Sequence, residues 1–265
     1  MRNVLVTGAE GGMGSAICKA LADEGYNVFG IDRKISGENF DERIRLYECD
    51  VTNPDAIGAL ADEIGKEAGE IFAIIHTAGI YDLDSLVEMD EERFVRIFNI
   101  NLFGVFRINK AFLPLISKGG RIIITTSELA PLDPLPFTGI YGITKSALEK
   151  YAYSLRMELN LLGISVSVIR PGATKTPLLS DSTSALERFC NGTELYSCNA
   201  ERFKKIVDSV EAKNVPVERI GKLALKAIRA KKPRLVYNIN RNPLLRLLNL
   251  LPDRIQIFII SKILK

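Results

Sequence analysis

Three side chains between residues 127 and 145 have the types and the spacing needed to oxidise an alcohol. Tyr141 and Lys145 stand four residues apart in "TTSELAPLDPLPFTGIYGITKSALEKY", and Ser127 precedes them. A spacing of four puts the phenol and the ammonium on one face of a helix. A free tyrosine titrates near pH ~10, and a neighbouring ammonium should lower that pKa and make the phenol a better base. Such pairs also occur on the surfaces of amphipathic helices, so the surrounding elements must show whether this pair is catalytic.

The N-terminal segment predicts a dinucleotide site. Residues 3–7 form a short apolar run, which indicates a buried strand, and Gly8, Gly12 and Gly14 follow before an apolar-periodic helix. Glycines between a strand and a helix leave backbone N–H groups free to hold a pyrophosphate at the helix N-terminus. Asp32 ends the next strand, where a carboxylate can accept hydrogen bonds from a ribose.

Strands and helices alternate along the chain. Strands are expected near 3–7, 27–32, 44–49, 71–77, 121–126, 164–169 and 234–238, and helices near 13–24, 54–68, 90–117, 138–162 and 217–230. This order predicts one α/β domain of the Rossmann type, a doubly wound parallel sheet of about seven strands with helices on both faces. Ligands of such sheets bind beyond the carboxyl ends of the strands. Those ends carry Gly8, Asp32, Asp50, Thr77, Ser127 and Pro171.

Taken together, the motifs resemble those of the short-chain dehydrogenase/reductase family in its compact single-domain form. They follow the family order through residues 1 to about 200: TGxxxGxG at 7–14, Asp32, CDVT at 49–52, HTAG at 76–79, NINLFG at 99–104, Ser127, the Tyr141/Lys145 pair and RPGATKTP at 170–177. Two departures are visible. HTAG stands where the family usually has NNAG, and Ser127 lies fourteen residues before Tyr141 where thirteen is typical, which lengthens a proline-rich loop.

The resemblance implies a role for each of four catalytic residues. Tyr141 would exchange a proton with the substrate oxygen, and Ser127 would hydrogen-bond that oxygen. Lys145 would lower the pKa of Tyr141 and hold the nicotinamide ribose, while Asn101 would hold a water that links Lys145 to solvent. The further cofactor contacts implied are Gly8, Glu10, Gly12, Met13, Gly14, Asp32, Arg33, Asp50, Val51, Thr77, Ala78, Gly79, Pro171, Gly172, Thr174 and Thr176.

Charge at the adenosine end predicts NAD as the cofactor in preference to NADP. Asp32 and Glu10 would repel the 2′-phosphate of NADP, whereas Arg33 could pair with it. Two carboxylates against one guanidinium favour NAD.

The substrate is expected to be a bulky apolar alcohol or ketone. Residues 177–214 occupy the segment that covers the substrate in this family, and they carry several apolar side chains among polar ones. A weaker similarity to the retinol and hydroxysteroid dehydrogenase branch points to such substrates. Two alternatives stay open: an NADP-dependent 3-oxoacyl thioester reductase, and a non-catalytic NAD-binding sensor or scaffold.

Composition excludes several other classes. The single histidine, His76, has no cluster of cysteines or acids near it, which disfavours a zinc site, and it is expected to be a hydrogen-bonded residue at a strand end. Cys18 and Cys49 are expected to be buried thiols, and Cys190 and Cys198 are not expected to pair. No signal peptide precedes the first strand, so a cytoplasmic location is expected, with no nucleic-acid partner.

The C-terminal segment differs from the rest in charge. Residues 221–265 hold eleven Lys and Arg and one acid, Asp253, a net charge of +10 in a chain whose total is +3. We therefore divide the chain into a catalytic domain, 1–240, and a basic apolar tail, 241–265. The tail could lie on an anionic membrane as a peripheral contact, or it could pack on the domain or on another subunit of a homo-oligomer (dimer or tetramer).

Overall fold

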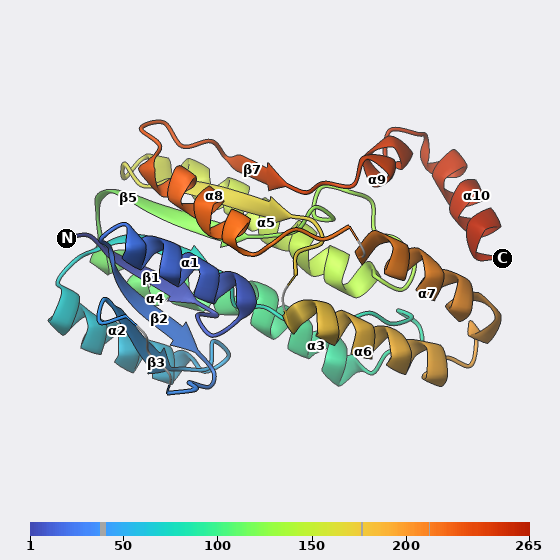
Figure 1. The fold of residues 1–265 in the computed structure, drawn as a ribbon, viewed down its shortest axis with the longest axis horizontal. Helices are drawn as coiled ribbons and strands as arrows, with labels where there is room; N and C mark the ends of the chain where they lie inside the picture. Colours follow the sequence, from blue (N-terminus) through green and yellow to red (C-terminus); the bar gives the residue numbers. More distant parts are fainter. Residues whose placement is uncertain (38–40, 176, 212) are drawn as a thin grey trace.

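Seven parallel strands form a single sheet in the computed structural model, which describes residues 1–37, 41–175, 177–211 and 213–265 (Figure 1). The strand order is β3-β2-β1-β4-β5-β6-β7, which is a doubly wound order because the chain reverses direction across the sheet after β3. The strands are β1 (Asn3–Thr7), β2 (Asn27–Asp32), β3 (Ile44–Glu48), β4 (Ile71–His76), β5 (Ile116–Thr125), β6 (Ser165–Pro171) and β7 (Val236–Ile239). The predicted fold class is confirmed.

Helices follow the strands in the expected alternation, with one region that differs from the prediction. The α-helices are α1 (Gly12–Asp23), α2 (Pro54–Ala68), α3 (Glu91–Phe98), α4 (Gly104–Phe112), α5 (Gly139–Asn160), α6 (Pro177–Gly192), α7 (Ser197–Glu211), α8 (Glu218–Arg229), α9 (Pro243–Leu248) and α10 (Asp253–Leu264). None of the helices in the described part of the chain is long and apolar enough to cross a membrane.

The single helix predicted over 90–117 is wrong. Helices α3 and α4 are separated by a π-helical turn, η1 (Asn99–Phe103), and a 3-10 turn, η2 (Leu113–Leu115), ends the segment. Pro114 lies in η2, where its ring and its missing N–H stop an α-helix. Strand β5 then begins at Ile116, five residues before its predicted start, and passes through Gly119 with a positive φ of 79°. The two glycines of this strand masked its β pattern in the sequence.

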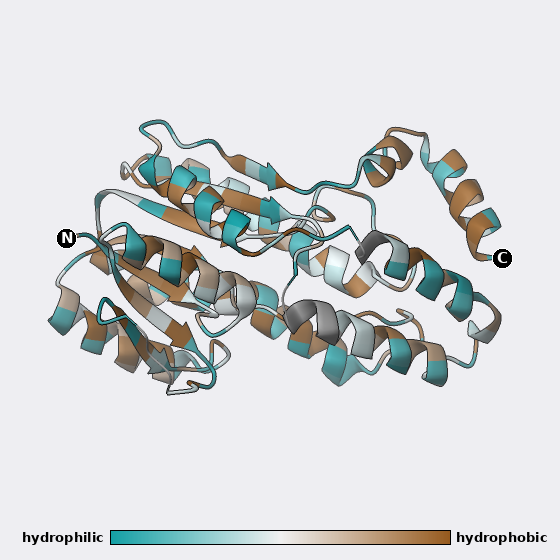
Figure 2. Ribbon diagram, in the orientation of Figure 1, coloured by the Kyte–Doolittle hydropathy of each residue, from teal (hydrophilic) through white to brown (hydrophobic). Residues whose placement is uncertain are grey.

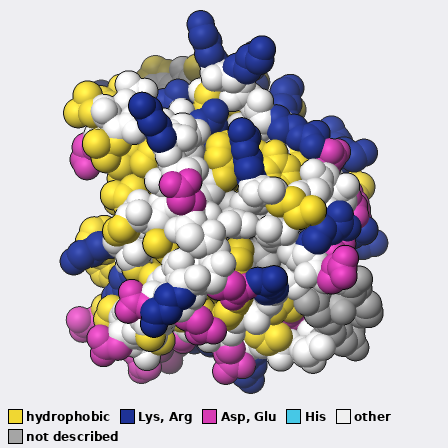
Figure 3. Space-filling model, turned by 90° about the vertical axis from the view of Figure 1, so that its left-hand side faces the viewer, with side chains coloured by type: hydrophobic (Ala, Val, Ile, Leu, Met, Phe, Trp, Pro, Cys, Tyr) yellow, Lys and Arg dark blue, Asp and Glu magenta, His cyan; other side chains and the backbone are white. Residues whose placement is uncertain are grey.

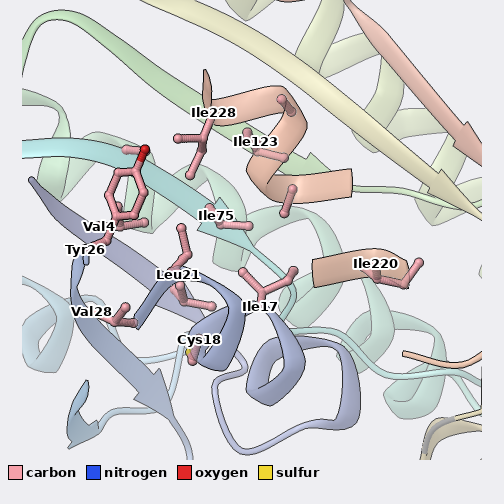
Figure 4. Close-up of a cluster of buried hydrophobic side chains, with 14 of the residues drawn as sticks. Val4, Ile17, Cys18, Leu21, Tyr26, Val28, Ile75, Ile123, Ile220 and Ile228 are labelled. Carbon is pink, nitrogen blue, oxygen red and sulfur yellow. The ribbon is translucent and has the colours of Figure 1, made fainter. Parts of the chain in front are cut away.

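Alternate residues of the strands face two different layers of helices. Val4 and Val6 of β1 pack with α1 and α8, whereas Leu5 packs with α2 and α4 on the other side. Further along the sheet, α5 covers β5 and β6 on the α4 side. Figure 4 shows the first of these clusters, in which Ile17 and Leu21 of α1 meet Ile220 and Ile228 of α8 over the strands. The core therefore fixes all the strand ends at one edge.

The segments predicted to be a lid and a tail both lie beyond this edge of the sheet (Figure 1). Residues 177–214 contain α6 and α7, which pack through a cluster that includes Phe189 and Phe203. Residues 241–265 contain α9 and α10, and α10 begins directly after Pro252. Both segments thus surround the place where catalytic residues were predicted.

Candidate active site

Tyr141 and Lys145 lie one turn apart near the start of α5, and both are buried. The Lys145 Nζ atom is 5.5 Å from the centroid of the Tyr141 ring and donates a hydrogen bond of 3.3 Å to the backbone oxygen of Thr125 at the end of β5. The Tyr141 ring also contacts Tyr81, with 4.7 Å between ring centroids. The phenol and the ammonium therefore share one helix face, as their spacing predicted.

Ser127 lies at the carboxyl end of β5, beside Tyr141. Its Oγ accepts a hydrogen bond of 3.2 Å from the backbone N–H of Leu129, and its side chain also hydrogen-bonds the Tyr141 phenol. The next residue, Glu128, donates its backbone N–H to the Pro171 oxygen at 2.8 Å. These bonds tie the loop after β5 to the end of β6 and hold the hydroxyl next to the phenol.

Burial changes the acidity of both groups in α5. It raises the pKa of Tyr141 to about 12, and the hydrogen bond with Ser127 opposes that rise. Burial also lowers the pKa of Lys145 to about 8. We expected from the sequence that the ammonium would lower the pKa of Tyr141. Burial of the phenol is the largest influence on that pKa in this structure, and the net shift is upward.

Asn101 lies in the π-helical turn η1 and is fully buried. Its Oδ1 accepts a hydrogen bond of 2.8 Å from the Ile80 N–H, and its Nδ2 donates to the Ile80 oxygen at 3.0 Å. The same Nδ2 lies 3.3 Å from the Thr144 Oγ1, one residue before Lys145. The amide thus joins the loop after β4 to the catalytic helix.

The glycine turn after β1 has the close contacts that a dinucleotide turn requires. Gly8 has a φ of 73°, and a Cβ atom there would lie 2.6 Å from the Ala78 nitrogen. A Cβ on Gly14 would lie 1.9 Å from the Gly8 oxygen. Helix α1 then begins at Gly12, and among the described residues no side chain caps it, so its first N–H groups remain for an anion. This arrangement fits the pyrophosphate of a nicotinamide dinucleotide.

Two acidic residues are held in place at the adenosine end. Asp32 accepts hydrogen bonds from the Glu10 N–H at 3.0 Å through Oδ2 and from the Arg33 N–H at 2.7 Å through Oδ1. Asp50, next to Val51, accepts from the Thr52 N–H and hydroxyl, each at 2.8 Å. Fixed carboxylates at this position fit the hydroxyls of a ribose.

The remaining residues predicted to contact the cofactor lie at the ends of β4 and β6. The Thr77 hydroxyl donates to the Thr7 oxygen at 2.6 Å, which fixes the loop that includes Ala78 and Gly79. The Gly172 N–H donates to the Ile239 oxygen at 2.9 Å, and the Thr174 hydroxyl donates to the Gly172 oxygen at 2.9 Å. The predicted contact Thr176 lies outside the described residues.

A cavity of about 210 Å³ lies beside Ser127 and Tyr141 and reaches the loop after β6, which was predicted to contact the nicotinamide. Its lining residues are Met13, Tyr81, Ser127, Glu128, Leu129, Leu135, Thr138, Tyr141, Pro171, Gly172, Ala173, Thr174, Ser182, Phe203, Ile206, Val207 and Leu245. Eleven of these were not among the predicted site residues, Tyr81, Glu128 and Leu245 among them. Tyr81 and Glu128 adjoin predicted motifs, and Leu245 comes from the tail.

The other chemically notable residues behave as structural groups. His76 ends β4, is buried, and lies with its Nε2 2.8 Å from the Asn109 Oδ1; burial lowers its pKa to about 4. Cys18 and Cys49 are buried, and Cys190 and Cys198 are free thiols. In the part of the chain that the structure describes, no group of three or more His, Cys, Asp or Glu could hold a metal.

Comparisons with known proteins agree with this geometry. Residues 2–187 match the family model described as short chain dehydrogenase. A 3-ketodihydrosphingosine reductase of Bacteroides thetaiotaomicron is 29% identical over 231 residues, which cover 87% of this chain and 84% of that protein. An NADPH-dependent 3-dehydrocapnine reductase of Ornithobacterium rhinotracheale is 28% identical over 268 residues, covering 96% and 94%.

More distant similarities point the same way. Estradiol 17-beta-dehydrogenase 2 of Mus musculus is 31% identical over 185 residues, which cover 65% of this chain and 48% of that protein, a weak link to the hydroxysteroid branch. The fold matches that of a short-chain dehydrogenase from Streptomyces avermitilis with a TM-score of 0.76 and 22% identity, covering 90% of this chain and 88% of that one. The chain therefore belongs to the short-chain dehydrogenase/reductase family and is an oxidoreductase with a Rossmann-type nucleotide-binding fold.

Proposed function

We propose that the protein interconverts a secondary alcohol and a ketone, or a primary alcohol and an aldehyde, on a bulky apolar substrate such as a hydroxysteroid or a retinoid, with NAD(H). The observation that carries this proposal is the cavity of about 210 Å³ that presents Ser127 and Tyr141 to apolar side chains of α7, Phe203 and Ile206 among them. A ligand held there would have its oxygen beside the two hydroxyls and its apolar body against α7.

The catalytic steps follow from the positions of four side chains. When bound, the nicotinamide group supplies or accepts a hydride at the substrate carbon. Ser127 donates a hydrogen bond to the substrate oxygen, and Tyr141 gives that oxygen a proton or takes it back. Lys145 carries the proton that replaces the one lost from Tyr141, and Asn101 keeps the adjoining loop in position.

We assign NAD as the preferred cofactor from the charges at the adenosine end. The carboxylate of Asp32 is fixed by two backbone N–H groups, so it cannot turn away from a 2′-phosphate without losing both hydrogen bonds. Glu10 adds a second negative charge, and Arg33 is the basic side chain that opposes them. One relative named above is NADPH-dependent, so the cofactor must be measured directly.

A second candidate substrate is supported by Glu128. This carboxylate lines the cavity next to Ser127 and is buried, with one oxygen, Oε2, accepting the Asn242 N–H. Burial raises the pKa of Glu128, and the Asn242 N–H and Arg241 oppose that rise. An apolar steroid would add no polar partner for this carboxyl group, whereas a long-chain 2-amino ketone would bring an ammonium to it. 3-Ketodihydrosphingosine, the compound in the name of the Bacteroides relative, is of this kind.

Glu128→Gln tests the second candidate. The variant should lose roughly tenfold or more in kcat/KM for a 2-amino ketone and retain its activity on the matching ketone without the amine, because a charged hydrogen bond contributes about 1.5–3 kcal/mol. The glutamine can still accept the Asn242 N–H, so the tail contact is kept. Equal losses on both substrates would assign Glu128 to structure alone.

Two further proposals concern the whole protein. We assign it to the cytoplasm, supported by its free thiols. We also assign it to a homo-oligomer, supported by exposed apolar side chains that α3, α4, α5 and the adjoining turn present: Val95, Phe103, Phe106, Tyr153 and Met157.

The proposed function is tested by following nicotinamide absorbance over a panel of steroids, retinoids, 2-amino ketones, acyl thioesters and sugars with both cofactors. Turnover of an apolar ketone or alcohol with NAD(H) supports it. Turnover of 3-oxoacyl thioesters with NADPH would favour the reductase alternative. Tight NAD binding without turnover of any substrate would favour the sensor or scaffold alternative.

A further inference from the structure

Helices α9 and α10 of the tail turn polar side chains toward the domain. Gln256 of α10 is only 6% exposed, and its Nε2 donates to the Asp133 Oδ2 at 3.2 Å and to the Leu251 oxygen at 2.9 Å. The Asn249 Nδ2 donates to the same Asp133 oxygen at 2.7 Å. At the far end, the Asn199 Nδ2 donates to the Leu264 oxygen at 2.7 Å. These bonds fix which side of the tail faces the protein.

The exposed side of α9 and α10 carries large apolar side chains beside basic ones, whereas the exposed side of an ordinary surface helix is polar. Six large apolar side chains, here called the tail face, are each more than half exposed: Leu244, Leu247, Leu250, Ile257, Phe258 and Ile263. Figure 2 shows the apolar segments of α9 and α10 at the margin of the molecule. A group of exposed large apolar side chains of this kind indicates a contact with another apolar phase or protein.

The charge of the residues around the tail face indicates which partner, an apolar phase or a protein, the tail contacts. Residues 241–265 contain five Lys and Arg and one Asp, so their net charge is +5 − 1 = +4. Arg246, Arg254, Lys262 and Lys265 are exposed beside the apolar side chains. Two tails brought face to face would repel each other, whereas an anionic bilayer would attract them. Figure 3 shows the opposite end of the molecule, where Lys and Arg stand among Asp and Glu.

We propose that the tail face docks the enzyme on an anionic lipid bilayer, with α9 and α10 lying in the plane of the interface. Helix α10 has 12 residues. It therefore extends about 18 Å, well below the ~30 Å of a hydrocarbon core. Apolar side chains inserted below the headgroups, flanked by basic residues at the headgroup level, are the arrangement that interfacial helices adopt.

The inner side of α9 connects this docking surface to the catalytic cavity. Leu245 lines the cavity with Tyr141, while its neighbour Leu244 belongs to the tail face. The start of α9 is held at the cavity by the bond from the Asn242 N–H to Glu128. An apolar substrate dissolved in the bilayer would thus reach Tyr141 by passing beside α9. This second part rests on the proposed function, whereas docking itself does not.

Flotation of the full-length protein with vesicles tests the docking. We expect binding to phosphatidylcholine vesicles that contain phosphatidylglycerol, weaker binding to pure phosphatidylcholine, and release by added salt. The variant Ile257→Ser/Phe258→Ser should lose binding. The variant Arg254→Gln/Lys262→Gln should bind roughly 30-fold more weakly to the anionic vesicles, at about 1 kcal/mol for each charge.

Leu161→Ser/Leu162→Ser is the matched control, because these leucines are as exposed as Ile257 and Phe258 but follow α5 at the other end of the molecule. It should bind vesicles as the wild type does. Circular dichroism and NAD binding show whether each variant is folded. A wild-type protein that ignores anionic vesicles at low salt would overturn the docking, as would a tail variant that only changes the oligomer.

Activity measurements test the substrate route separately. Ile257→Ser/Phe258→Ser should lose turnover of an apolar substrate embedded in vesicles and keep turnover of a water-soluble one. Equal turnover of both would overturn the route and leave the docking in place. A protein that floats with vesicles but turns over no substrate would instead contradict the proposed function.

Discussion

At the scale of single residues, Asp32 gives the clearest prediction about cofactor choice. Asp32→Ala should weaken NAD binding roughly tenfold and raise the kcat/KM ratio of NADP to NAD, because a fixed negative charge disappears while Arg33 remains. Titration of both cofactors, followed by fluorescence, measures the change. Asp32→Asn is the control, since it removes the charge and keeps one of the two hydrogen-bond acceptors. Wild-type protein that already prefers NADPH would contradict the assignment.

His76 gives a prediction about pH, and its sign follows from the direction of the shift. Burial lowers its pKa from 6.5 to about 4, so below pH 6.5 the unfolded chain takes up a proton that the folded chain does not. The stability it contributes is complete above pH 6.5 and is lost as the pH falls toward 4. The loss is about 1.4 kcal/mol for each pH unit in that window.

Chemical unfolding at several pH values between 7 and 5 measures this loss. His76→Asn should unfold with a shallower pH dependence than the wild type, because the chain contains a single histidine. Equal slopes for the two proteins would show that another group controls stability in this window.

Some features of the site could be predicted from the spacing of nearby residues in the sequence, and others depend on the fold. Tyr141, Lys145 and the glycines of the first turn could be predicted, because their spacing within one helix or one turn carries the chemistry. The pKa of Tyr141 could not, because it depends on burial by groups such as Tyr81 that only the fold brings near. Leu245 was missed for the same reason, since it reaches the cavity from a hundred residues further along the chain.

At the scale of elements, the loop between Ser127 and Tyr141 joins the lid to the catalytic helix. Phe137 in this loop has a φ of 64°, and its ring centroid lies 4.5 Å from that of Phe189 in α6 and 5.1 Å from that of Phe203 in α7. The longer proline-rich loop thus ends in an aromatic anchor for both lid helices.

Phe137→Ala should remove that anchor. We expect the free energy of unfolding to fall by roughly 3–5 kcal/mol and KM for an apolar substrate to rise, because Phe203 also lines the cavity. Urea unfolding and steady-state kinetics measure the two effects. Phe94→Ala is the control, since Phe94 stands at the surface and its ring pairs with Phe98 alone among the described residues. Equal costs in the two variants would contradict the anchoring role.

Most elements were predictable within a few residues because apolar β-branched runs alternate with amphipathic helices. The region from α3 to β5 was the exception. The π-helical turn at Asn101 does not interrupt the helical pattern of apolar residues in the sequence. Gly119 and Gly120 have no side chains, so they weaken the pattern of apolar residues that would indicate the strand β5. Both features are set by tertiary contacts: Asn101 bonds the loop after β4, and β5 is completed by its neighbours in the sheet.

At the scale of the whole molecule, the segments proposed to bind cofactor, substrate and lipid all lie at the edge of the sheet where the parallel strands end. The glycine turn, the catalytic helix, the lid and the tail all meet there, so cofactor, substrate and lipid would approach a single end of the protein (Figure 1). The sequence predicted this convergence for the cofactor and catalytic residues through the parallel sheet. It left open where the tail lies, because the position of α10 depends on hydrogen bonds with Asp133 and Asn199 in distant segments.

The central claim is that Tyr141 gives and takes the proton of an alcohol or ketone while the hydride moves. The most direct measurement compares wild type and Tyr141→Phe for turnover and for NAD binding on the best substrate of the panel. We predict a loss of roughly 10²–10⁴ in kcat with an NAD dissociation constant nearly unchanged, because the ring stays in place and only the hydroxyl is removed. A phenylalanine variant that keeps most of its activity would contradict the mechanism.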